Sequence, residues 1–254
     1  MGHFQSILTK AGTIRRMLSL DRQNEWRERY RAEHPGWRPA TEVFAAAVRA
    51  SLPPDGRWLD LGCGRGGLVE QLPHPAARTF GIDPDYASLR GHRLPGLARA
   101  VALSDGLPFG EATFDVITAA WLLEHLSDPA RTFAAVARAL RPGGAFIFIT
   151  PNGGHPLGWA NRAAGRLGRW QGRLVDAIYG RAEGDTFPTA YRANTPETLR
   201  RLTVAAGLSL EALDCVADPS YLAVNVAAFR VMALIDDQLP AERRIHLVGV
   251  ARQR

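Results

Sequence analysis

The stretch that decides the fold is Trp58-Leu59-Asp60-Leu61-Gly62-Cys63-Gly64-Arg65-Gly66-Gly67. A short apolar run enters a glycine-rich turn, which predicts a strand that runs into a tight turn and then a helix. Glycines suit such a turn because a side chain there would keep a ligand away from the backbone, and the following helix N-terminus offers unpaired N–H groups. We therefore expect a ligand to sit on this turn.

The nature of that ligand depends on the residue two positions before the first glycine. Gly62, Gly64 and Gly67 also spell the G-x-G-x-x-G pattern of nicotinamide-binding folds, so the glycines alone leave two cofactor classes open. The carboxylate of Asp60 would repel a dinucleotide pyrophosphate, whereas it suits a ligand with a cationic amine or sulfonium at that position. S-adenosylmethionine is such a ligand.

Two further carboxylates follow the next predicted strands. Asp83 ends a strand 21 residues after Gly62, where it can accept both ribose hydroxyls. Asp105 follows a third strand and can accept the adenine amino group. The alternative for any one of these acids is a helix cap or a solvated strand end, but three of them in register at strand ends favour a cofactor edge.

The chain around this stretch alternates between strand and helix patterns from about residue 40, which is the signature of a parallel sheet covered on both faces. One helix is predicted to begin at Asp128-Pro129 and to stop at Gly143-Gly144, and a later one to begin at Thr195-Pro196 and to stop at Gly207. Tyr221–Ile235 reads as a buried helix. The expected strands number seven and are Arg57–Leu61, Thr79–Asp83, Ala100–Ser104, Phe114–Ala119, Ala145–Thr150, Leu208–Val216 and His246–Ala251.

We divide the 254 residues into four segments. Residues 1–39 form an N-terminal helical lid, 40–150 the cofactor-binding core, 151–193 a helical insertion that acts as a substrate lid, and 194–254 the C-terminal part of the sheet. The formal net charge is +6, and the positive excess lies in 1–39, with 8 basic and 4 acidic residues, and in 151–193, with 6 and 3. The positive excess therefore lies in the two segments that flank the cofactor-binding core.

The combination of motifs resembles the class I S-adenosylmethionine-dependent methyltransferases, in particular the group of small-molecule methyltransferases that includes the ubiquinone-biosynthesis enzymes. The resemblance implies an α/β fold with a Rossmann-like, doubly wound seven-stranded sheet, mostly parallel with an antiparallel last strand, plus helical lid segments. The matching residues cover 57–150 and are Leu59 to Gly66, Asp83, Asp105 to Phe109, Leu123-Glu124-His125-Leu126 and Leu140-Arg141-Pro142-Gly143-Gly144.

The resemblance also assigns roles at the cofactor. It places the acid and the glycines around the first turn against the methionine part of the cofactor, and the acid that ends the second strand at the ribose. It places residues after the second and third strands at the adenine. The alanines at the end of the fourth strand would touch the methionine part and the sulfonium. The cofactor residues implied in this way are Asp60, Gly62, Gly64, Asp83, Pro84, Ser104, Asp105, Ala119 and Ala120.

His125 is the candidate catalytic residue, because a neutral imidazole near the transferred methyl group could take a proton from an attacking hydroxyl. The Glu-His pair recurs in this resemblance group across different substrates, so His125 could instead fix the loop after the fourth strand. Methyl transfer from a sulfonium needs mostly in-line positioning and desolvation, and an essential base is not required.

The acceptor is expected to be a small organic molecule, most specifically the oxygen of a natural-product or glycan-type substrate. Nucleic acid is excluded because the residues after the fourth strand are Ala119-Ala120-Trp121-Leu122 rather than the Pro-Pro-aromatic motif of amino methyltransferases, and Cys63 and Cys215 are expected to be inert thiols. No Asp-rich set suits a magnesium site, so no metal is predicted. The candidate substrate residues in the lids are Tyr30, Arg38, Trp159, Tyr191 and Arg192.

Charge gives a further expectation about the acceptor. Arg162, Arg166, Arg169 and Arg173 recur on one helical stripe of the insertion, which favours an acceptor with a carboxylate or phosphate. The alternative is a solvated Arg face with aromatic residues in the lid's own core. The residue pattern leaves both interpretations open.

Cellular context and rival functions complete the expectations. Two cysteines without metal spacing indicate a reducing cytoplasm, and no stretch has the roughly 20 apolar residues of a membrane span. One rival function is a cofactor-binding module without turnover. Another is a peripheral membrane methyltransferase that acts on a lipid or lipid-linked substrate, since the apolar residues of 7–18 alternate with Lys10, Arg15 and Arg16 as in an interfacial helix. The sequence leaves the oligomeric state open.

Overall fold

The computed structural model of the chain describes residues 19–158 and 189–254. These residues divide into two compact units. The sheet unit holds residues 40–152, 189–215 and 246–254, and the helical unit holds the described parts of 19–39, 153–158 and 216–245. The predicted C-terminal segment 194–254 is thus divided, because its middle part groups with the helical unit.

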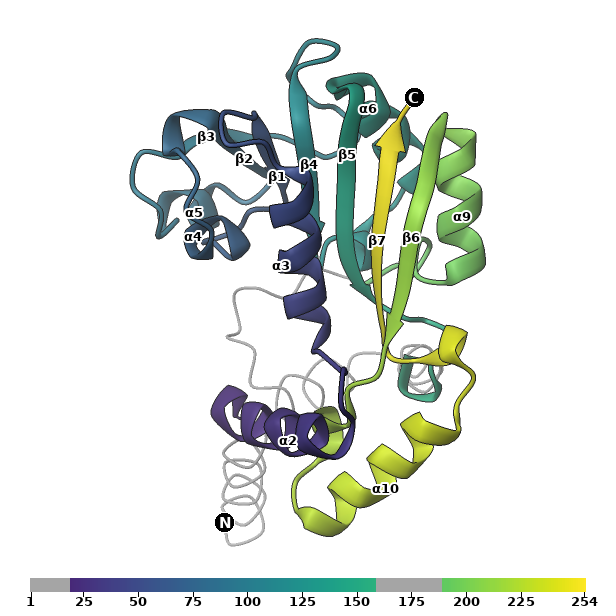
Figure 1. Cartoon of the computed structure of the whole chain (residues 1–254). Helices are drawn as coiled ribbons and strands as arrows, with labels where there is room; N and C mark the ends of the chain where they lie inside the picture. Colours follow the sequence, from purple (N-terminus) through teal and green to yellow (C-terminus); the bar gives the residue numbers. More distant parts are fainter. Residues whose placement is uncertain (1–18, 159–188) are drawn as a thin grey trace, which may run out of the picture. The chain divides into compact units, whose positions relative to one another are not determined.

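The sheet unit is built on one seven-stranded sheet with the order β3-β2-β1-β4-β5-β7-β6 (Figure 1). Pairing is parallel from β3 across to β5, and β7 runs antiparallel to β5. This is the predicted fold, a Rossmann-like sheet that is mostly parallel. The strands are β1 (Trp58–Leu61), β2 (Thr79–Asp83), β3 (Ala98–Val101), β4 (Phe114–Ala120), β5 (Leu140–Pro151), β6 (Leu208–Val216) and β7 (His246–Gln253).

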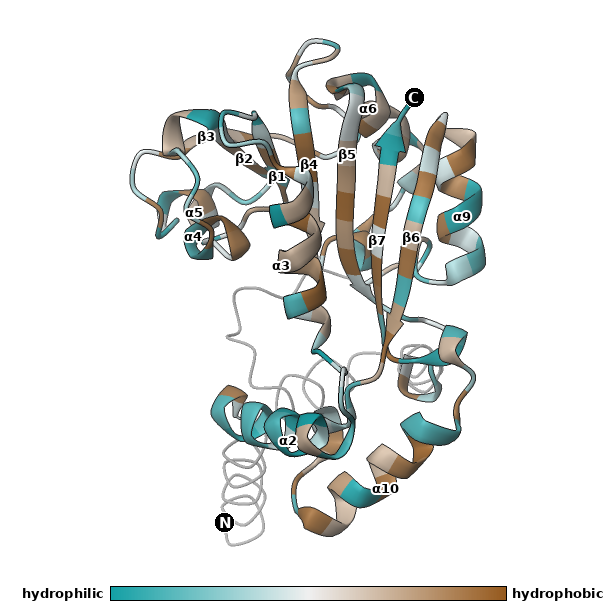
Figure 2. Cartoon of the chain, in the orientation of Figure 1, coloured by the Kyte–Doolittle hydropathy of each residue, from teal (hydrophilic) through white to brown (hydrophobic). Residues whose placement is uncertain are grey.

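The central strands are buried on both faces, as a covered parallel sheet requires. Every residue of β1 is buried, and the apolar colour runs along β4 and β5 in Figure 2. Phe133 of α6, Leu199 of α9 and Phe146 of β5 share one core cluster. The helices and turns of this unit are α3 (Ala40–Ser51), α4 (Leu68–Gln71), η1 (Ala76–Arg78), α5 (Tyr86–Arg90), η2 (Leu123–His125), α6 (Pro129–Ala139) and α9 (Pro196–Ala205).

The helix starts follow the predicted caps. The Asp128 side chain accepts a hydrogen bond from the backbone N–H of Arg131 at 3.2 Å, with Pro129 in the first turn of α6. The Thr195 hydroxyl accepts from the N–H of Thr198 at 3.2 Å, with Pro196 in the first turn of α9. Both caps satisfy N–H groups that a helix start leaves without a partner.

The predicted end of the first of these helices is wrong. Helix α6 ends at Ala139, and residues 140–142 already belong to β5, where Leu140 pairs with Phe114. The two glycines therefore lie within a strand, next to a register shift between Phe114 and Val116. Gly143 has φ +78°, so it lets the strand bend at that irregularity.

The predicted third strand is displaced. The structure places β3 at Ala98–Val101 instead of residues 100–104, and its last pair joins Val101 to Asp83. Pairing with β2 therefore ends before Ser104 and Asp105, which lie in the following loop. A short, exposed edge strand has a weak apolar pattern, which explains the error.

The helical unit contains α2 (Leu20–Glu33), η3 (Pro219–Leu222), α10 (Val226–Gln238) and η4 (Ala241–Arg243). Its core joins Trp26 and Tyr30 of α2 to Phe229 and Ala233 of α10. The rings of Trp26 and Phe229 stack with centroids 4.9 Å apart. Contacts between α2, η3 and α10 therefore hold this unit together.

The predicted buried helix over 221–235 needs correction. The helix begins at Val226, where the Asn225 side chain accepts from the N–H of Ala228 at 2.8 Å. One face is buried through Phe229, but Val231 and Leu234 are 56% and 62% exposed. Within 19–158 and 189–254, none of the helices is both long and apolar enough to cross a membrane.

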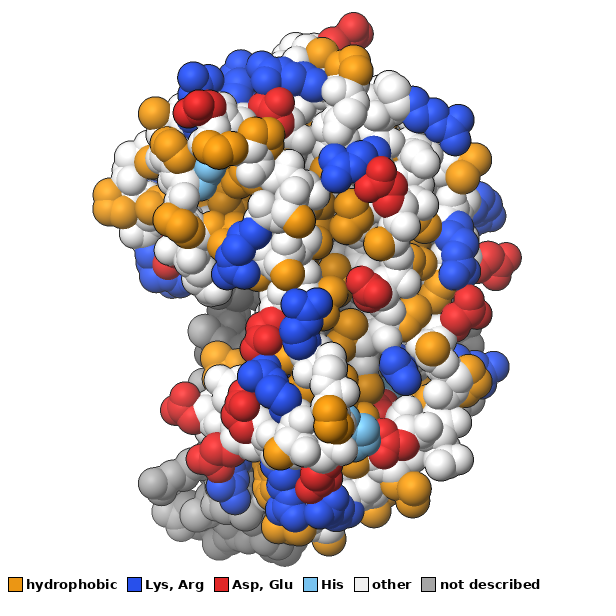
Figure 3. Space-filling view, in the orientation of Figure 1, with side chains coloured by type: hydrophobic (Ala, Val, Ile, Leu, Met, Phe, Trp, Pro, Cys, Tyr) orange, Lys and Arg blue, Asp and Glu red, His pale blue; other side chains and the backbone are white. Residues whose placement is uncertain are grey.

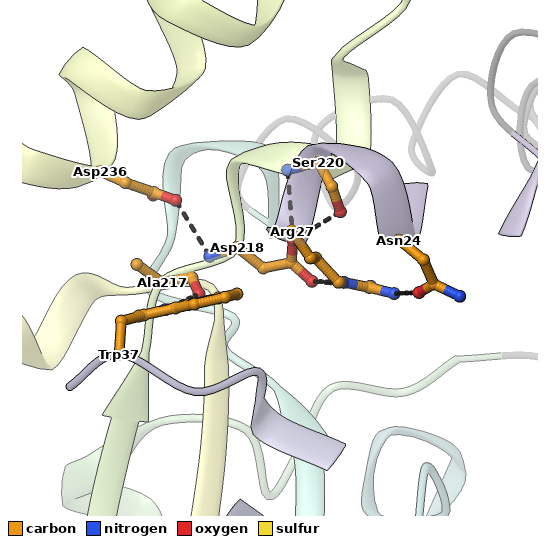
Figure 4. Close-up of polar contacts among 7 residues, drawn as sticks. All are labelled: Asn24, Arg27, Trp37, Ala217, Asp218, Ser220 and Asp236. Atoms are coloured by element: carbon orange, nitrogen blue, oxygen red, sulfur yellow. Dashed lines mark hydrogen bonds and ion pairs between the residues drawn. The ribbon is translucent and has the colours of Figure 1, made fainter. Parts of the chain in front are cut away.

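A polar network fixes η3 against α2 and α10 (Figure 4). The buried Asp218 carboxylate accepts from Nε and Nη2 of Arg27 at 3.0 and 2.7 Å, and from the N–H of Ser220 at 3.2 Å. The Asp236 carboxylate accepts from the N–H of Asp218 at 3.1 Å and lies 3.3 Å from Nε2 of buried His155. These carboxylates are satisfied inside the helical unit.

Candidate active site

The candidate site lies where the strand order of the sheet reverses. Strands β1 and β4 are neighbours, with β2 and β3 on one side and β5 on the other. In open α/β sheets, ligands bind at the carboxyl ends of the strands at such a switch point. The residues that follow β1, β2 and β4 therefore form the candidate ligand-binding edge, and all of them belong to the sheet unit.

The glycine turn after β1 is fixed against β2 through its backbone. The N–H groups of Gly62 and Cys63 both donate to the carbonyl of Ile82, at 2.8 and 3.0 Å. Gly62 has φ +69°, and a Cβ atom there would lie 3.0 Å from Cδ1 of Leu122. The positive φ favours glycine at position 62, and a Cβ atom there would also require the Leu122 side chain to shift.

Asp83 connects the end of β2 to the glycine turn. One carboxylate oxygen accepts from the N–H of Gly64 at 2.9 Å, and the other accepts from the N–H of Asp85 at 2.8 Å. A Cβ atom at Gly64 would meet nothing within 4 Å, so open space lies beside this glycine. The acid predicted to hold the ribose is thus already oriented by two backbone donors.

Asp60 is a buried carboxylate, 7% exposed. Thr118 of β4 donates its hydroxyl proton to Oδ1 of Asp60 at 2.7 Å, and the indole N–H of Trp58 donates to the Thr118 oxygen at 2.9 Å. Burial raises the pKa of Asp60 to about 7, the Thr118 hydrogen bond opposes the rise, and the charge of Asp83 adds to it. Among the described residues, no cation contributes to this balance.

The Cys63 side chain stays a protonated thiol at neutral pH. Its side chain is buried, and burial raises the pKa of the thiol to about 12. Its sulfur lies against Gly81 of β2, where a Cβ atom would come within 2.7 Å of Sγ. The thiol therefore fills space beneath the turn, in line with the inert role predicted for it.

The residues predicted at the adenine, Pro84, Ser104 and Asp105, share no hydrogen bond with one another in the described part of the chain. Pro84 is exposed, and Asp105 lies in the loop after β3. The hydroxyl of Ser104 is 3.1 Å from the hydroxyl of Thr132 in α6. The contacts of these three residues with a cofactor stay predictions.

At the end of β4 the chain turns sharply. Ala119 is fully buried, and the N–H of the residue after Ala120, Trp121, donates to the carbonyl of Ile149 at 2.9 Å. Trp121 has φ +56°, which is unusual for a bulky residue, and its ring packs edge-on against His246 with centroids 5.1 Å apart. Sequence reasoning assigns no role to Trp121, because a strained backbone angle leaves no mark in the residue pattern.

His125 ends the turn η2 that follows, and its N–H donates to the carbonyl of Leu122 at 2.9 Å. The structure brings two predicted substrate residues to this turn. Tyr191 donates its backbone N–H to the carbonyl of Glu124 at 3.0 Å, and Nη1 of Arg192 donates to the carbonyl of Ser127 at 2.8 Å. His125, Tyr191 and Arg192 are therefore grouped around η2.

The remaining predicted substrate residues belong to the helical unit or are not described. Tyr30 is 3% exposed and donates its hydroxyl proton to Asp237 at 2.8 Å. Burial raises the pKa of Tyr30, and the hydrogen bond to Asp237 adds to the rise. Arg38 is exposed. Trp159 and the four arginines of the predicted stripe lie outside the described residues.

The residues at the carboxyl ends of β1 and β2 fit S-adenosylmethionine. A buried carboxylate with a raised pKa gains a counter-charge from a cationic ligand, and an oriented second carboxylate matches a pair of hydroxyls. When bound, the cofactor supplies an electrophilic methyl group on a positively charged sulfur. Asp60 and Asp83 are the residues of this chain that would hold the cofactor.

Known proteins whose sequences are similar to this chain include methyltransferases. Residues 26–213 match a family described as a methyltransferase domain. A ubiquinone biosynthesis O-methyltransferase from Hahella chejuensis is 41% identical over 111 residues, which cover 41% of this chain and 46% of that protein. A second one, from Alkalilimnicola ehrlichii, is 38% identical over 103 residues, covering 38% and 42%. The matched region is less than half the length of these curated relatives.

Solved structures share the fold at low sequence identity. An S-adenosylmethionine-dependent methyltransferase from Mesorhizobium loti is 24% identical with a TM-score of 0.53, covering 84% of this chain and 98% of that one. A possible histamine N-methyltransferase from Thermotoga maritima is 20% identical with a TM-score of 0.56, covering 91% and 95%. The [4+2]-cyclase SpnF is also similar, with 20% identity, a TM-score of 0.55 and coverage of 84% and 81%.

Proposed function

Because the chain belongs to the class I S-adenosylmethionine-dependent methyltransferases, we propose that it transfers a methyl group from S-adenosylmethionine to an oxygen of a small organic molecule. The finer proposal is a natural-product or glycan-type acceptor that carries a carboxylate or phosphate. The names of the curated relatives support oxygen as the methylated atom.

The observation that carries the proposal is the pair of carboxylates at the ends of β1 and β2. Asp60 is buried with a pKa near 7, and Asp83 is oriented by the N–H groups of Gly64 and Asp85. A sulfonium beside the first and a ribose at the second satisfy both. A dinucleotide would instead bring a pyrophosphate toward Asp60, at a cost in electrostatic energy.

Calorimetric titration tests the cofactor directly. We expect micromolar affinity for S-adenosylmethionine and S-adenosylhomocysteine, which corresponds to about −8 kcal/mol. NAD is the matched control and should not bind measurably. Equal affinity for NAD would overturn the cofactor assignment.

Turnover separates an enzyme from a cofactor-binding module. The assay measures S-adenosylhomocysteine release from S-adenosylmethionine when fractions of a metabolite extract are added. A shared fold leaves the reaction open, as the cyclase SpnF among the structural neighbours illustrates. Binding with no release in any fraction would favour the module over the enzyme.

His125 is the base in the finer form of the proposal, and fixing the loop is its alternative role. Replacement of His125 by Gln keeps side-chain size and hydrogen bonding but removes basicity. If His125 is the base, turnover falls by about 10²–10⁴-fold while cofactor affinity stays level. A loss below about tenfold would assign it to loop fixing.

The charge part of the proposal rests on the lid arginines. In α2, Arg29 pairs with Glu33 at 3.3 Å and Arg31 with Glu28 at 3.3 Å, so these groups already have partners. Positive and negative side chains are also interspersed on the face seen in Figure 3. The acceptor Michaelis constant should rise with ionic strength if anion recognition is real. An acceptor whose turnover ignores salt would leave shape and aromatic contacts as the basis of selectivity.

A lipid or lipid-linked acceptor is the second candidate. The observation in its favour is the outward face of α10, where Val226, Val231 and Leu234 are 50%, 56% and 62% exposed. Sedimentation with vesicles of phosphatidylglycerol and phosphatidylcholine tests it. Binding that Leu234→Ser weakens would favour this candidate, whereas recovery of all protein in the supernatant would exclude it.

A further inference from the structure

Three buried polar side chains, one of them from η2, are connected to one another by hydrogen bonds. Glu124, Thr150 and Asn194 are 3%, 0% and 1% exposed. The Thr150 hydroxyl donates to Oε2 of Glu124 at 3.0 Å, and Nδ2 of Asn194 donates to the Thr150 oxygen at 2.6 Å and to the carbonyl of Pro151 at 3.1 Å. Glu124 belongs to η2, Thr150 belongs to β5, and Asn194 lies two residues before the start of α9.

The backbone of Glu124 closes this arrangement into a ring. Its carbonyl accepts from the N–H groups of Ala190 and Tyr191, at 2.7 and 3.0 Å. Residues 190–194 are thus held at two points, by the Glu124 carbonyl near one end and by Thr150 and Pro151 at the other. Glu124 takes part through both its side chain and its main chain.

Several features of this ring of contacts are energetically unfavourable, and packing alone does not explain them. A buried carboxylate is expensive to desolvate, and Oδ1 of buried Asn194 has no hydrogen-bond partner among the described residues. Tyr191 is held at φ +50°, a conformation that bulky residues rarely adopt. Costs of this kind gather at functional positions, where the surrounding structure fixes an otherwise unfavourable geometry.

The residues that the ring holds are those grouped around η2, which is the acceptor side under the proposed function. His125 follows Glu124 directly, Tyr191 is attached to the Glu124 carbonyl, and Arg192 lies between the two attachment points. Cofactor contacts are expected at a different place, around Asp60, Asp83 and Gly64. A change in the ring should therefore alter the acceptor side while leaving the cofactor side intact.

We propose that Glu124 is a positioning residue, which acts through Thr150 and Asn194 to place His125 and Tyr191 for the acceptor. The inference rests on the proposed function for the meaning of the acceptor side. Its physical content is that the Thr150 hydroxyl, which joins the Glu124 carboxylate to Asn194, sets the position of both segments.

The test compares Thr150→Val with Thr150→Ser in the full chain. Valine keeps the side-chain volume and removes the hydroxyl, whereas serine keeps the hydroxyl and loses a methyl group. In the valine variant we expect the amides of Ala190 and Tyr191 to exchange about tenfold faster, and the ¹⁵N-labelled imidazole signal of His125 to move. The serine variant should restore both readouts to wild-type values.

A matched control separates positioning from a general loss of stability. Thr203 is also fully buried in the sheet unit, and its hydroxyl donates to the carbonyl of Leu199 at 2.8 Å within α9. Thr203→Val should lower the melting temperature without changing the exchange at 190–191 or the His125 signal. Equal changes in both valine variants, or no change with Thr150→Val, would overturn the inference.

Binding of S-adenosylhomocysteine to the same variants keeps the two proposals apart. We expect its affinity to stay within twofold of wild type with Thr150→Val. A wild-type chain that does not bind S-adenosylhomocysteine would refute the proposed function, whereas the exchange and imidazole readouts would still decide whether Glu124 positions the two segments. A tenfold loss of this affinity in Thr150→Val alone would count against a role confined to the acceptor side.

Discussion

Two pairs of buried carboxylates, one in each unit, have very different partners. In the helical unit, Asp218 is paired with Arg27, and Asp236 accepts from the N–H of Asp218 (Figure 4). Asp236 also lies 3.3 Å from Nε2 of His155. In the sheet unit, Asp60 accepts from the Thr118 hydroxyl, and its pKa is raised to about 7 by burial. A satisfied carboxylate serves the scaffold, whereas one without a counter-charge is available to a cationic ligand.

The largest expected effect is on the satisfied pair. Replacement of Arg27 by Met removes both donors to Oδ2 of Asp218 and leaves a buried charge without its counter-charge, held by the hydrogen bonds from Ser220 to Oδ1. The free energy of unfolding should fall by about 3–5 kcal/mol, measured by urea unfolding, while the affinity for S-adenosylhomocysteine stays within about twofold.

Arg22→Met is the matched control, because Arg22 pairs with Glu25 on the same helix with both side chains exposed. Its cost should stay below about 1 kcal/mol. A similar cost for both variants would mean that burial of Asp218 makes no difference. A large loss of cofactor affinity in Arg27→Met would contradict the purely structural role of the Arg27–Asp218 pair.

Replacement of Asp60 by Asn should act in the opposite direction on stability. Since the pKa of Asp60 is raised from its ordinary value to about 7, the native state binds a proton that the unfolded state has lost between about pH 4 and 7. Wild-type stability without ligand should therefore decrease as the pH rises through this range, by on the order of 4 kcal/mol at most.

The asparagine variant cannot ionise, so it should be more stable than wild type at pH 8 and similar at pH 4.5. Its affinity for S-adenosylmethionine should nevertheless be lower, because the counter-charge is gone. Wild-type affinity should itself fall as the pH drops below about 7, by up to tenfold per pH unit. Thermal unfolding and calorimetry at both pH values check these signs, and a variant that is less stable at pH 8 would contradict the assignment.

The sequence predicted the carboxylates of the sheet unit, Asp60 and Asp83, but not the ion-paired carboxylates of the helical unit. The reason lies in the distance between partners along the chain. Asp60 and Asp83 stand at fixed spacings from Gly62, so local pattern identifies them. Asp218 meets Arg27 across 191 residues, and no local pattern records that contact. The grouping of residues 216–245 with the helical unit escapes sequence reasoning for the same reason.

Errors in the predicted elements have a related origin. Glycines stop helices, so the sequence predicts the end of α6 at Gly143-Gly144, yet pairing of Leu140 with Phe114 takes the chain into the sheet before the glycines. The strained backbone at Trp121 and Tyr191 is also invisible in the sequence, since their conformations depend on hydrogen bonds to Ile149 and Glu124. Residue patterns identify elements well where local signals agree, and tertiary pairing decides the rest.

Replacement of Asp83 by Ala tests whether the second carboxylate of the sheet unit contributes to cofactor affinity. The change removes the acceptor for the N–H groups of Gly64 and Asp85 together with the expected ribose contact. Affinity for S-adenosylhomocysteine should fall by about 100-fold, as expected for lost hydrogen bonds to a charged group. Calorimetry measures this change.

Asp85→Ala provides the neighbouring control. The Asp85 side chain caps α5 by accepting from the N–H groups of Ala87 and Ser88, both at 3.1 Å. This variant should lose about 1 kcal/mol of stability and keep its affinity for the cofactor. If Asp83→Ala lost no more affinity than this control, Asp83 would belong with the scaffold carboxylates.

The smallest expected effect concerns an ion pair beside the glycine turn. Arg93 donates to both oxygens of Glu70, at 2.9 and 2.8 Å, and a Cβ atom at Gly66 would clash with Glu70. The Arg93 side chain is 60% exposed, so water compensates most of what its removal costs. The backbone bond from the N–H of Arg93 to the carbonyl of Arg65, 2.9 Å long, survives replacement by Ala.

Arg93→Ala should therefore lower the affinity for S-adenosylhomocysteine by less than about fivefold and stability by less than about 1 kcal/mol. A loss as large as that of Asp83→Ala would show that the turn depends on this exposed pair, and that burial is a poor guide to which charges matter at the site.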